Sequence, residues 1–77
     1  SQAVACAPGN AVWLMNHGNA LRELGRTAEA EERFRDSLTA NPALAEAWLN
    51  LGDLLHRQGL WRKADEAWAK AEAIRPD

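Results

Sequence analysis

The side chains best suited to covalent or metal chemistry are few in this chain: one cysteine, Cys6, and two histidines, His17 and His56. A cysteine–histidine nucleophile pair or a metal site requires such groups to converge with further ligands. The histidines fall at different positions of two separate predicted helices, and Cys6 lies in an N-terminal stub. We therefore predict no catalytic residue, no metal site and no cofactor. Cys6 is expected to be a small buried thiol, His17 half-buried and His56 exposed.

The charge and hydropathy of the chain argue against nucleic acid and membrane as partners. Nine basic and eleven acidic side chains give a net charge of -2. The chain lacks the basic excess that drives phosphate binding, so we predict no nucleic-acid partner. No secretory signal is visible, and no apolar run approaches the roughly 20 residues of a membrane span, so no membrane contact is predicted. A single cysteine suits a reducing compartment, which favours a cytoplasmic location. The excess of arginine over lysine and the many alanines suggest a bacterial gene.

The elements that position these side chains follow a repeat. All three prolines, Pro8, Pro42 and Pro76, are spaced 34 residues apart. A fixed period of this size marks an architecture in which each unit stacks on its neighbours instead of closing its own core. It favours a binding scaffold over a catalytic domain. Other residues recur at the same interval: Ala11 with Ala45, Asn16 with Asn50, Gly18 with Gly52, Leu21 with Leu55, Gly25 with Gly59, Ala30 with Ala64, and Glu32 with Glu66.

Within each repeat the sequence predicts a helical hairpin. Alanine is abundant and β-branched residues are few, which favours helix. Glycine supplies the left-handed backbone that closes a helix, at Gly25 and Gly59, and proline stops the helix before it. Asn10 and Thr27 are expected to cap helix starts, whereas burial of Trp61 is expected to hold the start of the last helix. We predict a helical stub over 1–6 and helices over 10–24, 27–40, 44–58 and 61–74.

Apolar side chains recur every three or four residues and predict the buried faces. Gly18 and Gly52 interrupt these bulky faces, at a cost of about 1 kcal/mol each in helix propensity, so they indicate close approach of two helices. His17 stands where the second repeat has a leucine, so it must find a polar partner or reach the hairpin edge. Trp13 is expected to fill volume beside the N-terminal stub. The positions predicted to lie on these faces are Leu14, Leu21, Leu24, Ala30, Phe34, Ser37, Leu38, Trp48, Leu51, Leu54, Leu55, Ala64, Trp68 and Ala71, together with half-buried His17.

The repeated residues resemble those of a known family, the tetratricopeptide repeat. The second repeat has its W-x-x-L-G core and spacing, in Trp48, Leu51, Gly52, Leu55, Gly59, Ala64, Trp68, Ala71 and Pro76. The first repeat follows with Leu14, Gly18, Leu21, Gly25, Ala30, Phe34, Ser37 and Pro42. The resemblance divides the chain into the tail of a preceding repeat over 1–10, one repeat over 11–44 and another over 45–77. It implies an all-α fold of tandem antiparallel helix hairpins, stacked as a right-handed solenoid segment.

The same resemblance implies a concave groove, lined by the first helix of each pair, that holds a peptide from a partner protein. Spacing of three and four residues puts two sets of side chains on one side of these helices. Asn16 and Asn50 are similar to the asparagine ladder of O-linked N-acetylglucosamine transferases, which holds a peptide backbone. A carboxylate clamp is disfavoured because Met15 and Leu49 occupy the places of its lysines. The predicted peptide-binding residues are Met15, Asn16, Asn19, Arg22, Glu23, Leu49, Asn50, Asp53, His56 and Arg57.

Three interpretations of function follow. The first is a protein–protein interaction scaffold without a reaction of its own. The second is homotypic assembly into an oligomer, because the chain is expected to start and end inside a longer array and to leave its end helices uncovered. The third is a non-catalytic appendage of a larger enzyme.

Overall fold

The computed structural model describes residues 8–74, and the predicted stub over 1–6 lies outside this range. Four helices make up the described chain: α2 (Pro8–Glu23), α3 (Thr27–Ala40), α4 (Ala45–Arg57) and α5 (Trp61–Ile74). All four predicted helices are therefore confirmed, with ends that differ by at most about two residues. The largest difference is the start of α2, which precedes Asn10, so Asn10 lies in the first turn and is not the N-cap.

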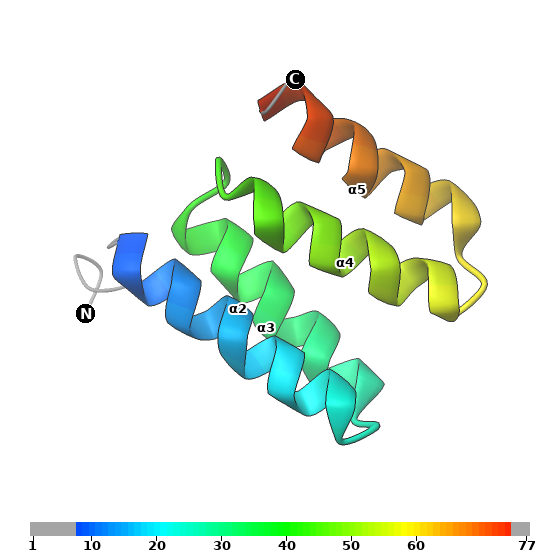
Figure 1. Cartoon of the computed structure of the whole chain (residues 1–77), viewed down its shortest axis with the longest axis horizontal. Helices are drawn as coiled ribbons and strands as arrows, with labels where there is room; N and C mark the ends of the chain where they lie inside the picture. The colour runs from blue at the N-terminus through cyan, green and yellow to red at the C-terminus, as the bar shows by residue number, and fades with distance from the viewer. Residues whose placement is uncertain (1–7, 75–77) are drawn as a thin grey trace.

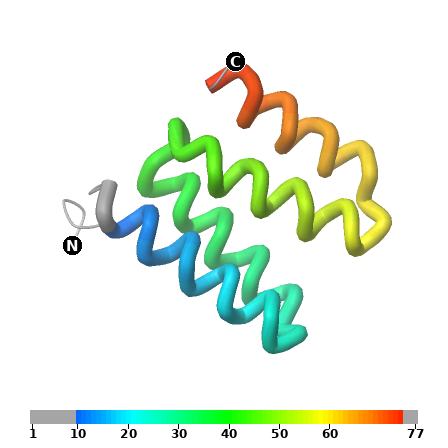
Figure 2. Tube along the Cα trace, viewed as in Figure 1, coloured from blue at the N-terminus to red at the C-terminus, as the bar shows by residue number. Residues whose placement is uncertain are grey.

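The helices lie side by side in chain order, and each runs antiparallel to the one before it (Figures 1 and 2). The closest packing joins α2 to α3 and α4 to α5, and α4 also packs on α3 and touches α2. The Cα positions extend over 35 × 31 × 16 Å. Within residues 8–74 the buried apolar side chains form one cluster to which both hairpins contribute, as predicted for an all-α repeat fold.

Each hairpin turns through the same glycine-closed helix end. Gly25 and Gly59 both have φ of 83°. The N–H of Arg26 donates to the carbonyl of Leu21, and the N–H of Leu60 donates to the carbonyl of Leu55. Together with the bonds from the glycine N–H groups to Arg22 and His56, these contacts form the Schellman arrangement that satisfies the last carbonyls of a helix. The predicted role of the two glycines is confirmed.

The turn between the hairpins is built by asparagine and proline. The Asn41 N–H donates to the carbonyl of Ser37, and the Asn41 side-chain oxygen accepts from the Ala43 N–H at 3.1 Å. The Leu44 N–H then donates to the carbonyl of Asn41. Proline at the second position of such a turn already has the required φ, and the asparagine side chain mimics a backbone turn. This turn connects α3 to α4.

Two further predictions about helix starts are also wrong. Thr27 is the first residue of α3, the N-cap position belongs to Arg26, and no side chain caps this helix. Trp61 is 64% exposed. It lies at the corner where α4 has already ended at Arg57, so little of the hairpin is there to cover it. At the start of α5 the first helical backbone hydrogen bond forms, from the Ala64 N–H to the carbonyl of Leu60.

The buried face follows the predicted periodicity, with two exceptions. Leu24 is 73% exposed because α2 ends at Glu23, and a residue past the helix end no longer follows the helical stripe. His17 is exposed instead of half-buried and lies against Trp13, with ring centroids 5.3 Å apart. Trp13 is 61% exposed, and the stub beside which it was expected to pack lies outside the described residues. The core cluster consists of Met15, Leu21, Ala30, Phe34, Leu38, Ala47, Leu51, Leu54, Leu55 and Ala64, with Leu44, Trp48 and Trp68 packed against it.

A buried hydroxyl also joins the first hairpin. Ser37 is fully buried, and its Oγ donates a hydrogen bond of 2.6 Å to the carbonyl oxygen of Ala11. This bond links the last turn of α3 to the start of α2. The equivalent residue in the second repeat, Ala71, has no hydroxyl, so the second hairpin packs there through apolar contact alone.

Candidate protein-interaction surfaces

The first helices of the two hairpins, α2 and α4, carry the predicted peptide-binding residues. Residues 11–23 of α2 correspond to residues 45–57 of α4, which lie 34 positions later in the chain. The two helices also touch each other directly. Side chains at matching positions are therefore displayed on neighbouring helices. We call the surface made by the predicted residues of α2 and α4 the α2/α4 surface.

Most of the predicted residues are accessible on this surface. Asn16 is exposed and Asn50 is half-buried. Leu49 is 43% exposed and offers an apolar contact between polar neighbours. The charged members are accessible too: Arg22 is half-buried, and Glu23, Asp53 and Arg57 are exposed.

Met15 differs from the other predicted binding residues because it is buried. Its side chain is only 7% exposed and belongs to the core cluster. Methionine is long and unbranched, so it can turn from the edge of a helix into irregular space between neighbouring side chains. The prediction that Met15 contacts a peptide is therefore wrong, although its repeat equivalent, Leu49, is accessible.

Asn19 and His56 have particular surroundings. The Oδ1 atom of half-buried Asn19 is buried and accepts no hydrogen bond from the described residues. His56 is exposed, as predicted, but its ring tilts against Trp68 of α5, with centroids 5.6 Å apart. His56 therefore stands at the boundary between α4 and α5 instead of facing α2.

The polar side chains of the α2/α4 surface are not occupied by one another. Within residues 8–74, the structure gives no side-chain hydrogen bond or ion pair to Asn16, Arg22, Asn50, Asp53 or Arg57. Their donors and acceptors are therefore available to a partner. This contrasts with α3, where Arg33 pairs with Asp36 at 2.9 Å and Arg35 with Glu31 at 2.8 Å. Arg26, just before the helix, lies 3.7 Å from Glu29.

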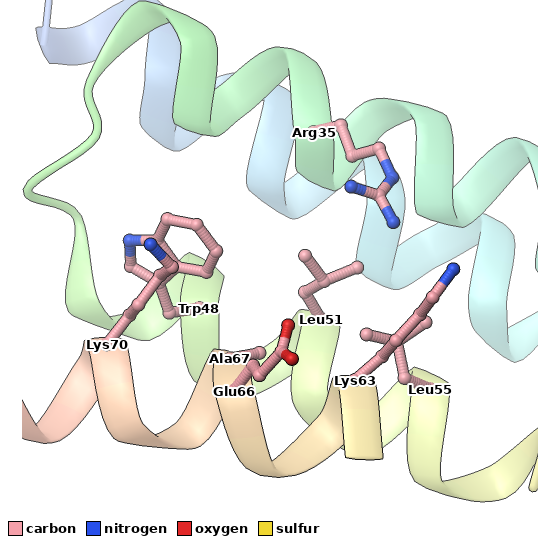
Figure 3. Close-up of a pocket in the computed structure, with 8 residues that line it drawn as sticks. All are labelled: Arg35, Trp48, Leu51, Leu55, Lys63, Glu66, Ala67 and Lys70. Atoms are coloured by element: carbon pink, nitrogen blue, oxygen red, sulfur yellow. The ribbon is translucent and has the colours of Figure 1, made fainter. Parts of the chain in front are cut away.

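A cavity of about 290 Å³ lies on the side formed by the second helices, α3 and α5, with α4 between them (Figure 3). None of the predicted peptide-binding residues lines it. Figure 3 shows Arg35 reaching into it from α3, opposite Lys63, Glu66 and Lys70 of α5. We call it the α3/α5 cavity; its lining residues are Arg35, Trp48, Leu51, Leu55, Lys63, Glu66, Ala67 and Lys70.

Trp48 is fixed within this cavity by its polar edge. Its indole Nε1–H donates to the carbonyl oxygen of Pro42 at 2.9 Å. The ring is half-buried, and the Lys70 ammonium lies 5.3 Å from the ring centroid, within the range of a cation–π contact. An adjoining hollow, also lined by Arg35, Trp48 and Leu51, continues past Leu38 and Thr39.

None of the sequence-based predictions includes this cavity. A signal was present: the chain has only two lysines, Lys63 and Lys70, and they are seven residues apart on one predicted helix. Seven residues are close to two helical turns, so both ammonium groups belong to one face. The position of Arg35 opposite them depends on how α3 and α5 flank α4, which no single helix specifies.

Among residues 8–74 no group of three or more histidine, cysteine or acidic side chains is placed to hold a metal ion. None of the described helices has the length and apolar character needed to cross a bilayer.

The sequence of the chain matches one protein family and two related proteins. Residues 15–77 match the family described as tetratricopeptide repeat. The chain is also similar to a protein named Protein O-mannosyl-transferase TMTC1 from Mus musculus and from Homo sapiens, at 35% identity over 60 residues in each case. This match covers 78% of the chain but only 6% of the mouse protein and 7% of the human protein. The chain thus corresponds to less than a tenth of the length of these relatives.

The match also bears on the role of the segment. The tetratricopeptide repeat is a non-catalytic module that serves in general as a scaffold for interactions between proteins. The helical hairpins, the two glycine-closed turns and the family match over most of the chain agree. The chain belongs to the tetratricopeptide repeat family.

Proposed function

We propose that the chain binds a peptide segment of a partner protein on the α2/α4 surface. The observation that carries this proposal is the pair Asn16 and Asn50, which occupy the same register on two touching helices and are accessible. Neither makes a side-chain hydrogen bond to another residue within 8–74. An amide donates and accepts at once, so it can hold a peptide main chain without depending on the side chains of that peptide.

The residues that neighbour the two asparagines would orient a bound peptide. Leu49 contributes an apolar contact, and Arg22, Glu23, Asp53 and Arg57 place both signs of charge around it. A surface with mixed charge discriminates among partners mainly by rejecting like charges. We therefore expect peptides with a small apolar residue and at least one charged residue to bind best.

The test begins with peptides selected from a random library against the 77-residue chain, followed by affinity measurement with Asn16→Ala/Asn50→Ala. Each lost hydrogen bond costs about 1 kcal/mol, so the double variant should bind roughly thirtyfold more weakly. Gln58→Ala is the control, because Gln58 is an exposed amide that follows the end of α4 and is not among the predicted binding residues. Unchanged affinity of the double variant, with helix content intact by circular dichroism, would remove the asparagine proposal.

A second candidate function is homotypic assembly, which one observation favours. Leu60 and Trp61 are 40% and 64% exposed and adjoin each other at the start of α5. Large apolar side chains that adjoin on a surface are a common feature of protein contacts. We propose that copies of the chain associate through this corner. Sedimentation at micromolar concentration should then show an oligomer that Trp61→Glu converts to a monomer, and a wild-type chain that stays monomeric would contradict it.

A third candidate is a non-catalytic segment of a larger enzyme. Both relatives are named as transferases. We therefore propose that this repeat segment belongs to a longer protein that is an enzyme, without proposing which reaction that enzyme catalyses. The full-length gene tests it directly: a catalytic domain beside the repeats would support the proposal, and an array of repeats alone would contradict it.

A further inference from the structure

We propose that the α3/α5 cavity is a second binding site, which takes an acidic peptide segment in the polyproline II conformation. The site is lined by the second helices and by α4, and it shares no lining residue with the α2/α4 surface, so it does not depend on the peptide-binding function proposed above. Three features carry it: unpaired positive charge, an anchored aromatic ring and the spacing of the charges.

Positive charge is concentrated in the cavity against the overall charge of the chain. The chain carries a net charge of -2, yet both of its lysines and Arg35 line this one site. Glu31 already pairs with Arg35, through bonds of 2.8 and 3.0 Å. Within residues 8–74, neither Lys63 nor Lys70 forms an ion pair. Two ammonium groups without a carboxylate partner select for an acidic ligand.

Trp48 supplies the apolar contact between these charges. Its indole N–H is already bonded to the carbonyl of Pro42, so the ring is held in place before a ligand arrives. Grooves lined by aromatic rings are a recurrent way to bind proline-rich extended segments, because such segments lose little conformational entropy on binding. Lys70, which rests over the ring, has a flexible side chain and can move aside to meet a carboxylate.

The spacing of Lys63 and Lys70 along α5 matches the repeat of a polyproline II segment. Seven residues of helix separate Lys63 and Lys70, which corresponds to about 10.5 Å along α5. In polyproline II, side chains return to the same face every three residues, or about 9.3 Å. Same-face residues of a β-strand are about 6.8 or 13.6 Å apart, which fits less well. A helical ligand with acidic residues seven positions apart has the same spacing as the lysines, so the binding test below includes such a peptide.

Nucleic acid is the alternative anionic ligand, and the walls of the cavity argue against it. Glu66 lines the cavity itself, and Glu31 holds Arg35 at its edge. These carboxylates repel a continuous row of phosphates but leave room for two separate carboxylates. The site therefore fits two acidic side chains three residues apart better than it fits a uniformly charged polymer.

The probe is a fluorescein-labelled proline peptide that contains the segment Glu-Pro-Pro-Glu, compared with the same peptide containing Gln-Pro-Pro-Gln. Fluorescence anisotropy with the 77-residue chain should show tighter binding of the acidic peptide by about fivefold or more at low salt, with the difference shrinking as salt rises. Equal binding of the two peptides would overturn the proposal. So would tighter binding of a single-stranded oligonucleotide, or of an acidic helical peptide with carboxylates seven residues apart.

Variants locate the binding on the chain. Lys63→Gln/Lys70→Gln should lower the affinity for the acidic peptide by about fivefold or more. The control Arg26→Gln/Arg62→Gln removes the same charge at exposed positions outside the cavity and should change affinity less than twofold. Equal losses in both double variants would mean nonspecific attraction and would overturn the site. Asn16→Ala/Asn50→Ala should leave this binding intact, which separates failure of this site from failure of the α2/α4 surface.

Discussion

Gly18 faces the ring of Phe34 so closely that a Cβ atom built on the glycine would lie 2.7 Å from Phe34 Cε1 and 3.2 Å from the carbonyl oxygen of Ala30. The second hairpin repeats the relationship, because a Cβ on Gly52 would meet the indole of Trp68. Real Cβ atoms do not approach other heavy atoms this closely, so each hairpin closes around a missing side chain. The distance between the paired helices is thus set by glycine at one position and an aromatic ring at the other.

Gly18→Ala is therefore expected to destabilise the chain. Alanine gains about 1 kcal/mol of helix propensity over glycine, but overpacking of this kind costs about 1–3 kcal/mol. We expect a net loss of about 1 kcal/mol in the free energy of unfolding, measured by urea denaturation. Phe34→Leu in the same background should recover part of the loss, since the shorter side chain gives the new methyl group room. A Gly18→Ala chain more stable than wild type would contradict this account of the hairpin.

Gly25→Ala separates backbone strain from lack of space. Gly25 has φ of 83°, and no atom lies within 4 Å of a Cβ placed there. The left-handed backbone costs a residue with a Cβ about 1–2 kcal/mol, so we expect a loss of about 1 kcal/mol in thermal or urea unfolding. Gly25→Asn should lose less, because asparagine tolerates this conformation. If alanine and asparagine were equally costly, the left-handed backbone would not be the cause.

Ser37→Ala tests the buried bond to Ala11. Loss of this 2.6 Å hydrogen bond should lower the free energy of unfolding by about 1 kcal/mol. Thr39→Ala is the control, because the Thr39 hydroxyl bonds to the carbonyl of Arg35 within the same helix and in contact with water. We expect the control to change stability by less than about 0.5 kcal/mol. Equal effects at the two positions would show that the Ser37–Ala11 bond does not stabilise the hairpin.

Much of the fold could be predicted because local signals and the repeat agree. Gly25 and Gly59 mark helix ends that depend only on backbone conformation, and the 34-residue interval predicts the second repeat from the first. The close approach at Gly18 and Gly52 also follows from sequence, since glycine within a helix has a cost that packing must offset. These features need no knowledge of how one hairpin sits on the next.

The remaining errors arise where the answer depends on neighbouring elements. Met15 and Leu49 share a register, yet one is 7% and the other 43% exposed, because a side chain at the edge of a stripe is buried or exposed by what packs beside it. Trp61 is apolar but lies at a corner that little covers. The α3/α5 cavity joins Arg35 of one repeat to Lys63 and Lys70 of the next, so the sequence pattern of one helix cannot predict it.

Trp48→Phe tests whether the indole N–H, and not only the aromatic ring, fixes the wall of the cavity. Phenylalanine keeps most of the apolar contact but cannot donate to the carbonyl of Pro42, which Trp48 Nε1 reaches at 2.9 Å. We expect a loss of about 1 kcal/mol in the free energy of unfolding by urea. Trp61→Phe is the matched control: it makes the same chemical change at a ring that is 64% exposed, and should alter stability by less than about 0.5 kcal/mol. If the two substitutions cost the same, the bond from Trp48 to the turn does not hold the ring in place. The acidic-peptide site would then lack the preformed surface on which its proposed selectivity depends.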